Sequence, residues 1–246
     1  MMGAPMDVPR RVSLVRRETW TALALAMGLL VYGNAMSALP DEQRDGFLLW
    51  SNLGLLALLL AWAIGVARFS LAEVGLDPKA APASAVFGVA VSFIVALPLV
   101  AFVLLAPVLT GGPVEAEGIT ERSSAGMAYF LLFRQPIGTA LFEEAAFRGV
   151  LYAAWQRAGG DRMAFLATSV AFSLWHITIT SRTVAESGVV NSPAGIVGGV
   201  VISLAGLFLG GLIFAYIRWH TRSIAAAAVA HWLIVAFMTA AVWAMG

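Results

Sequence analysis

The chain has 246 residues, of which 60% are hydrophobic and only 12% charged, with a net charge of +1 and no cysteine. A soluble domain carries about 25% charged residues, so the composition excludes a water-soluble globule and predicts an integral membrane protein. The lack of cysteine excludes disulfides, thiolate metal sites and cysteine nucleophiles. The Lys and Arg residues are scattered between apolar blocks, so we expect no nucleic-acid partner.

Seven apolar segments are long enough to be membrane-spanning helices, each of which needs about 20 mostly apolar residues. They cover residues 20–39, 46–67, 83–109, 125–156, 163–180, 195–217 and 223–245. The predicted fold class is therefore an all-α, polytopic transmembrane helical bundle with about seven spanning helices. We expect residues 1–19 to form a cytoplasmic N-terminal tail and residues 20–246 to form a single transmembrane domain.

The fourth segment permits a second interpretation. It contains Arg134 and Pro136, and a proline usually kinks or ends a helix because it lacks a backbone donor. In this alternative, residues 125–133 form a separate interfacial helix and the span itself covers about 136–156. The bundle would then have eight segments.

The basic residues predict the orientation, because cytoplasmic loops carry an excess of Lys and Arg. With the N-terminus inside, ten basic residues fall on cytoplasmic segments: Arg10, Arg11, Arg16, Arg17, Arg68, Lys79, Arg157, Arg162, Arg218 and Arg222. Three fall on outer segments: Arg44, Arg122 and Arg182. We therefore expect a multi-pass protein in the lipid bilayer of a cell's inner (plasma) membrane, with a cytoplasmic N-terminus.

Five ionisable residues lie inside the predicted spans. Glu143, Glu144 and Arg148 belong to the fourth span, His176 to the fifth and His231 to the seventh. Charges at membrane depth cost from about 2.5 kcal/mol upward, so each such residue is a functional-site hypothesis. Glu144 precedes Arg148 by four residues, which is the favourable order for an ion pair on one helix face. Glu143 points about 100° away and has no basic partner in register.

Three of these side chains are predicted to reach one layer of the membrane. Counted from the cytoplasmic ends of their spans, Glu143, His176 and His231 lie 13, 14 and nine residues deep. At about 1.5 Å per residue, these depths are roughly 20, 21 and 14 Å. A single buried histidine is more often a core residue than a ligand, but two histidines and a carboxylate at similar depth favour a shared site.

Such a site supports hydrolysis of an acyl bond. A carboxylate acts as a general base on water, one histidine holds that water, and a second stabilises a developing oxyanion. Two histidines and one carboxylate also match a catalytic zinc set with an open fourth position. The sequence leaves both schemes open: one needs no cofactor, and the other needs a divalent metal such as zinc on Glu143, His176 and His231. Neither a G-x-S-x-G elbow nor a phosphate-binding glycine loop is present.

Several blocks in the second half of the chain resemble the motifs of the CPBP intramembrane proteases, also called the Abi or CAAX-protease-like family. "EEAAFR" at 143–148 resembles the family's E-E-x-x-x-R, and "FSLWH" at 172–176 resembles its F-x-x-x-H. The stretch 208–231 is similar to the third and fourth blocks, a glycine-bearing helix followed by a short loop and a histidine. The blocks are specific in their order and spacing. They place a protease-like core at 125–246.

The resemblance implies an intramembrane endopeptidase that hydrolyses a peptide bond in a membrane-associated protein or peptide, as the family's type II CAAX prenyl endopeptidase does. Carried over position by position, it implies that Glu143 activates water together with His176, that His231 helps to bind the oxyanion, and that Glu144, Arg148 and the motif residue Phe172 support the site.

The sequence departs from the family pattern at one position. Four residues after His231 the family often has an asparagine, a second oxyanion donor, whereas this chain has Val235. A catalytically silent immunity or scaffold protein of the membrane is an alternative, because motif residues show the capacity for catalysis and not turnover. A small transporter with a proton-relay Glu/His site is a further one. It is disfavoured because transporters often repeat such features in both halves, and the first half here has no intramembrane charge.

Overall fold

The computed structural model describes residues 8–110, 118–187, 190 and 192–245, and within them every regular element is a helix. The predicted all-α bundle is therefore confirmed. With η marking a π-helix, the elements are α1 (Val8–Ser37), α2 (Asp41–Ala61), η1 (Trp62–Val66), α3 (Ala81–Thr110), α4 (Ser124–Tyr129), η2 (Phe130–Leu141), α5 (Phe142–Glu144), η3 (Ala145–Leu151), α6 (Tyr152–Trp175), α7 (Ile177–Glu186), α8 (Pro193–Thr221) and α9 (Ile224–Trp243).

Five helices in the described part of the chain are long and apolar enough to cross a membrane. They are Arg16–Ser37, Gln43–Val66, Ala81–Val108, Pro193–Thr221 and Ile224–Trp243, with mean hydropathies between 1.2 and 2.8. These helices coincide with five of the seven predicted spans. The count rises to six if the bent pair Ser124–Trp175 and Ile177–Glu186 forms one span. Residues 8–19 of the predicted tail are helical and continue into the rest of α1, while residues 1–7 lie outside the described residues.

The fourth and fifth predicted spans form a hairpin. Gly160 has φ +78° and ψ −175°, and the ring centroids of Phe147 and Phe172 on either side of it lie 5.4 Å apart. A continuous helix would separate these residues by about 37 Å, so the chain reverses at Gly160. The prediction of one continuous helix over 163–180 was wrong, because the second arm breaks at His176 and α7 leaves it at 45°.

The first arm of this hairpin is helical from Ser124 without a break. The separate interfacial helix over 125–133 is not present, because Tyr129 and Phe130 keep right-handed helical angles where α4 passes into η2. Pro136 lies inside η2. In an α-helix, proline removes an i→i−4 hydrogen bond and clashes with the carbonyl four residues earlier. A π-helix has a different hydrogen-bond pattern, so it can accommodate the proline.

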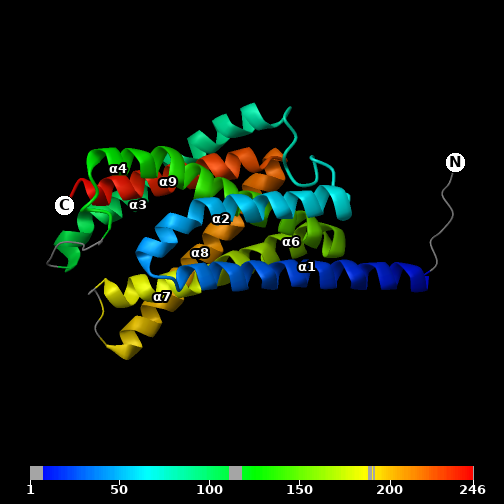
Figure 1. Ribbon diagram of the computed structural model, residues 1–246, viewed down its shortest axis with the longest axis horizontal. Helices are drawn as coiled ribbons and strands as arrows, with labels where there is room; N and C mark the ends of the chain where they lie inside the picture. Colours follow the sequence, from blue (N-terminus) through cyan, green and yellow to red (C-terminus); the bar gives the residue numbers. More distant parts are fainter. Residues whose placement is uncertain (1–7, 111–117, 188–189, 191, 246) are drawn as a thin grey trace.

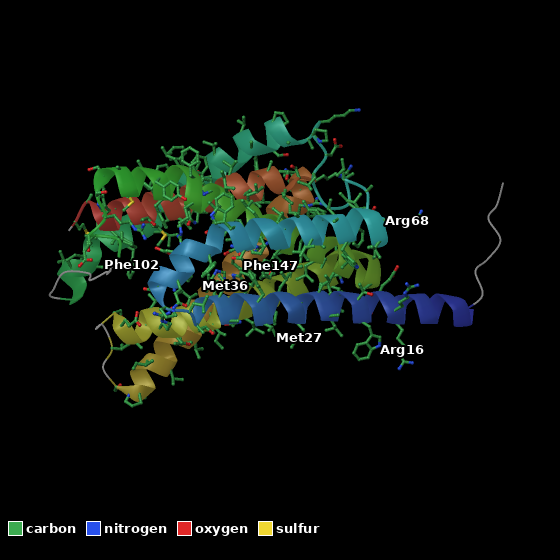
Figure 2. The ribbon with its side chains drawn as sticks, in the orientation of Figure 1. Arg16, Met27, Met36, Arg68, Phe102 and Phe147 are labelled. Carbon is green, nitrogen blue, oxygen red and sulfur yellow. The ribbon has the colours of Figure 1, made fainter. Side chains whose placement is uncertain are left out.

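The helices pack in two groups around this arm. The helix α6 lies between α1 and α8, while α3 lies along α9 at the opposite edge of the molecule (Figure 1). Glycines permit the closest approaches: a Cβ at Gly33 in α1 would strike the Trp175 ring, and a Cβ at Gly88 in α3 would strike the backbone of Ala226 in α9. All seven residues of η3 are buried, and Phe147 lies near the middle of the bundle (Figure 2).

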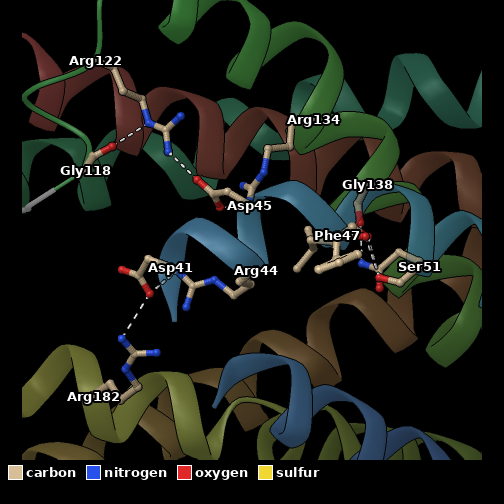
Figure 3. Close-up of polar contacts among 12 residues, drawn as sticks. Asp41, Arg44, Asp45, Phe47, Ser51, Gly118, Arg122, Arg134, Gly138 and Arg182 are labelled. Carbon is tan, nitrogen blue, oxygen red and sulfur yellow. Dashed lines mark hydrogen bonds and ion pairs between the residues drawn. The ribbon is translucent and has the colours of Figure 1, made fainter. Parts of the chain in front are cut away.

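One end of the bundle is tied together by ion pairs between segments far apart in sequence (Figure 3). These pairs are Arg122–Asp45, Arg134–Asp45 and Arg182–Asp41, and a fourth pair, Arg44–Asp41, lies within α2. Three of these four arginines are the basic residues predicted for the outer side. Each of those three is thus matched by a carboxylate at this end.

Candidate active site

The two adjacent glutamates lie in a short α-helical segment between two π-helices. Glu143 and Glu144 belong to α5, with η2 before it and η3 after it. Both glutamates are buried, with 5% and 0% of their surface exposed. A π-helix is rare, and where it interrupts an α-helix it is frequently found at a functional site. The backbone irregularity and the buried charges therefore coincide.

Glu144 is the centre of a buried polar network. Its Oε1 lies 3.1 Å from Nη1 of Arg148, as the four-residue spacing predicted, and 3.0 Å from Nδ1 of His231 in α9. Arg148 also donates from Nη2 to the carbonyl of Gly211 in α8, at 3.3 Å. The missing side chain of Gly211 allows α8 to lie close to α6, because a Cβ there would lie 3.0 Å from Ser169. One carboxylate thus links three helical segments.

Aromatic rings enclose the buried cation. The guanidinium carbon of Arg148 lies 4.1 Å from the ring centroid of Phe172 and 5.3 Å from that of Phe214. Phe214 in turn stacks on the ring of His231, at 5.3 Å between centroids. Cation–π contacts of this kind gain strength when the charge is removed from water. Phe172, predicted as a supporting residue, therefore contacts the site through its ring.

Glu143 faces both histidines. Its Oε2 lies 3.8 Å from Nε2 of His176 and 4.0 Å from Nε2 of His231. Both distances exceed a direct hydrogen bond, and this oxygen is buried with no hydrogen-bond partner among the described residues. The structure therefore brings the three predicted side chains together, with one carboxylate oxygen and two ring nitrogens converging on a small volume.

The hydrogen bonds of the two rings assign their tautomers. Nδ1 of His176 lies 2.8 Å from the carbonyl oxygen of Phe172, which can only accept, so Nδ1 carries the proton. Nδ1 of His231 likewise faces a carboxylate oxygen, that of Glu144. In each neutral ring the lone pair then sits on Nε2. Both lone pairs point toward Glu143.

Two asparagines that the sequence analysis did not single out hold this arrangement from outside. Asn34 of α1 donates from Nδ2 to the carbonyl of Leu174, at 3.0 Å, and its Oδ1 accepts from both N–H and Oγ1 of Thr178, at 3.0 and 2.7 Å. These contacts flank His176 on both sides. The signal in the sequence was a lone amide inside an apolar span, which the search for ionisable residues passed over.

The second asparagine acts on the other side of the site. Asn52 of α2 is buried, donates from Nδ2 to the carbonyl of Gly138 at 2.7 Å, and accepts from the Tyr32 hydroxyl at 2.7 Å. Gly138 lies in η2, where backbone bonding differs from that of an α-helix. Asn52 thereby ties α2 to the turn that precedes Glu143.

The three converging side chains do not form a metal centre as they stand. Among the described residues, no group of three or more His, Cys, Asp or Glu side chains is arranged to hold a metal ion. Ligand atoms about 2.0–2.2 Å from a tetrahedral zinc lie roughly 3.3–3.6 Å from one another, slightly closer than the 3.8 and 4.0 Å separations observed here. The separations also leave room for a water molecule between the carboxylate and the two imidazoles.

A comparison with known protein families matches the second half of the chain. Residues 125–237 match the family model described as type II CAAX prenyl endopeptidase Rce1-like. No curated protein and no solved structure matches the chain. The matched segment contains Glu143, His176 and His231, while α1, α2 and α3 precede it. The chain is a multi-pass membrane protein, and its residues 125–237 are similar to the Rce1-like family of type II CAAX prenyl endopeptidases, the family that the motifs resemble.

Proposed function

We propose that the protein is an intramembrane endopeptidase that hydrolyses a peptide bond in a membrane-associated protein or peptide. One observation carries the proposal: Oε2 of Glu143, which has no hydrogen-bond partner in the part of the chain that the structure describes, lies 3.8 and 4.0 Å from Nε2 of His176 and of His231. A water molecule can lie beside the line that joins two such atoms, at an ordinary hydrogen-bond distance of about 2.8 Å from each. The site therefore suits a bound nucleophilic water.

In the proposed reaction, Glu143 is the general base. Its carboxylate takes a proton from the water, whose other contact is the Nε2 lone pair of His176, and the water oxygen attacks the carbonyl carbon of the peptide. The oxyanion that forms accepts a hydrogen bond from Nε2 of His231. When the tetrahedral intermediate collapses, the C–N bond breaks and Glu143 returns its proton to the departing nitrogen.

Glu144 and Arg148 position His231 in this scheme. Nε2 of His231 donates a hydrogen bond only when the ring carries both protons. The Glu144 carboxylate, 3.0 Å from Nδ1, is the counter-charge for that form, and Arg148 fixes the same carboxylate from the other side. With Val235 in place of an amide, His231 carries more of the oxyanion stabilisation.

The activity is tested with the purified chain in lipid nanodiscs and a farnesylated peptide ending in a CAAX sequence, because the matched family is described by that activity. We expect mass spectrometry to find the peptide cut into two fragments by the parent protein. The His176→Ala variant should not cleave the peptide, because the water loses one of its hydrogen-bond partners. An unprenylated peptide of the same sequence shows whether the lipid chain is required. A parent protein that cleaves neither peptide would contradict the proposal and favour the silent scaffold.

The same assay decides between the two hydrolytic schemes. The metal-free scheme predicts that cleavage is unchanged after prolonged treatment with a zinc chelator. Loss of cleavage on chelation, with recovery on added zinc and not on added magnesium, would contradict that scheme. Such a result would assign Glu143, His176 and His231 to a metal that draws them closer together.

A further inference from the structure

A large cavity outside the candidate active site lies between α1 and the α2–η1 helix. Its volume is about 790 Å³, within the range of about 300–1,000 Å³ that is typical of small-molecule sites. The inner wall is apolar and is made by Ala24, Leu25, Leu29, Leu55, Leu59 and Ala154. A hydrocarbon chain packs favourably against such a wall, whereas water finds no hydrogen-bond partners there.

One end of the cavity, away from this apolar wall, is basic. Arg17, Arg68 and Arg157 line it together with a single acidic residue, Glu18. Arg16 and Arg68 mark this same end of the bundle in Figure 2, far from the outer ion pairs. The cavity therefore combines a deep apolar part with a cationic mouth, and it lies at the end where the predicted cytoplasmic basic residues gather.

The three arginines differ in whether a carboxylate of the protein neutralises their charge. Arg157 pairs with Glu73 at 2.7 Å and donates to the carbonyls of Ala67 and Arg68. Burial would raise the pKa of Glu73, but hydrogen bonds from Ser70 and Arg157 outweigh it and lower that pKa overall, so the pair is charged at neutral pH. Arg17 and Arg68 have no carboxylate partner within the described part of the chain. They are the cations left for a ligand.

We propose that this cavity binds one acidic phospholipid of the surrounding bilayer. An acyl chain occupies the apolar wall beside Gly28 and Leu59, and the anionic headgroup lies between Arg17 and Arg68. A membrane lipid with a negative headgroup has the required shape and charge, since both parts must be present in one molecule. The interface of an acidic membrane attracts exposed Lys and Arg side chains in the same way.

Gly28 supplies a direct test of the apolar part. Nothing lies within 4 Å of a Cβ built at this position, although Gly28 lines the cavity. A larger side chain there enters the space meant for the acyl chain without first striking the protein. Gly206 in α8 is the matched control, because it has the same free surroundings and does not line the cavity.

The experiment is native mass spectrometry of the full chain released from detergent, titrated with phosphatidylglycerol or phosphatidylcholine of identical acyl chains. We expect one phosphatidylglycerol to bind more tightly than phosphatidylcholine. The double variant Arg17→Ala/Arg68→Ala should weaken phosphatidylglycerol roughly fivefold per arginine and leave phosphatidylcholine unchanged. Gly28→Phe should weaken both lipids.

Two controls separate this site from general attraction. Lys79→Ala/Arg162→Ala removes the same charge from exposed positions at the same end of the bundle, outside the cavity, and should leave both affinities unchanged. Gly206→Phe should do the same. Equal affinity for the two lipids, or an equal loss in the two charge variants, would overturn the proposal. None of these variants touches Glu143 or the histidines, so cleavage and lipid binding are read separately.

Discussion

Glu143 and Glu144 are neighbours in sequence, yet their surroundings assign them different tasks. Glu144 contacts Arg148 and His231 and has no exposed surface. One oxygen of Glu143 faces two imidazoles and has no hydrogen-bond partner among the described residues. Adjacent positions on a helix point about 100° apart, and this divergence lets one carboxylate join the buried ion pair while the other faces the two histidines.

The first prediction concerns the buried cation. Arg148→Ala leaves the Glu144 carboxylate without its partner at 0% exposure, and breaking a buried ion pair from one side costs about 3–5 kcal/mol. We expect a lower melting temperature in detergent together with loss of cleavage. The control is Arg162→Ala, which removes an exposed arginine of α6 and should leave the melting temperature within error of the parent.

The sequence showed the ionisable residues of this site but not the neutral ones. Glu143, Glu144, Arg148, His176 and His231 were visible because charge inside an apolar span is rare. The polar contacts around His176 were not, because an amide such as Asn34 carries no charge and its partners are backbone groups 140 and 144 residues away. The same limit hid the contact of Glu144 with His231, since helix spacing predicts pairs within one helix only.

At the scale of single elements, the break between α6 and α7 positions a proposed catalytic ring. His176 has φ −94° and ψ 3°, so the helix ends there and the N–H groups of α7 need new partners. Asn34 supplies one of them by accepting from the N–H of Thr178. A helix break that hydropathy alone does not reveal is thus fixed by a residue of α1.

The second prediction follows from that break. Asn34→Ala removes the bonds to Leu174 and Thr178, so the His176 ring should lose its fixed orientation. We expect kcat to fall about tenfold or more while KM changes little, because misplacing a catalytic group affects the chemical step most. Ser181→Ala, which removes one exposed bond within α7, is the control. An equal fall of kcat in both variants would contradict a positioning role for Asn34.

The reversal at Gly160 is a second element that the sequence indicated only as a gap between apolar segments. With φ +78° and ψ −175°, the residue adopts a region that is essentially restricted to glycine. A side chain there is strained even though no atom lies within 4 Å of its Cβ. The hairpin that brings Phe147 against Phe172 therefore depends on one residue without a side chain.

The third prediction tests this dependence. Gly160→Ala should lower the free energy of unfolding by about 1–3 kcal/mol, the cost of holding a non-glycine residue in that region. Gly210→Ala in the middle of α8 is the matched control, because its Cβ also meets nothing within 4 Å. There alanine should stabilise by about 0.5–1 kcal/mol. Denaturation in the same detergent measures the change in the free energy of unfolding of both variants, which should have opposite signs. A Gly160→Ala protein as stable as the parent would show that the backbone at this position is not strained by a side chain.

At the scale of the whole molecule, charge distinguishes the two ends of the bundle. One end carries acidic partners for its arginines, shown in Figure 3, while the other carries Arg17 and Arg68 without carboxylate partners in the described residues. An excess of Lys and Arg on one side, whatever their carboxylate partners, is the pattern expected of a cytoplasmic face. Apolar composition allowed the bundle to be predicted, whereas the number of spans could not be counted reliably, because a hairpin and a broken arm have the same composition as full spans.

The fourth prediction is the orientation itself. Since the chain lacks cysteine, single cysteines report cleanly. A cysteine at Gly46, an exposed position with nothing within 4 Å of its Cβ, should react with a membrane-impermeant thiol reagent on intact cells. A cysteine at Lys79 should react only after the membrane is opened. The reverse pattern would place the N-terminus outside.

The substitution Glu143→Gln tests whether the Glu143 carboxylate is the base that activates water. The substitution keeps the size of the side chain and removes its capacity to take a proton. We predict that kcat on a cleaved peptide falls at least about 100-fold while the melting temperature stays at the parental value, with Glu121→Gln, an exposed glutamate, unchanged in both. A Glu143→Gln protein that cleaves at close to the parental rate would contradict the role of Glu143 as general base.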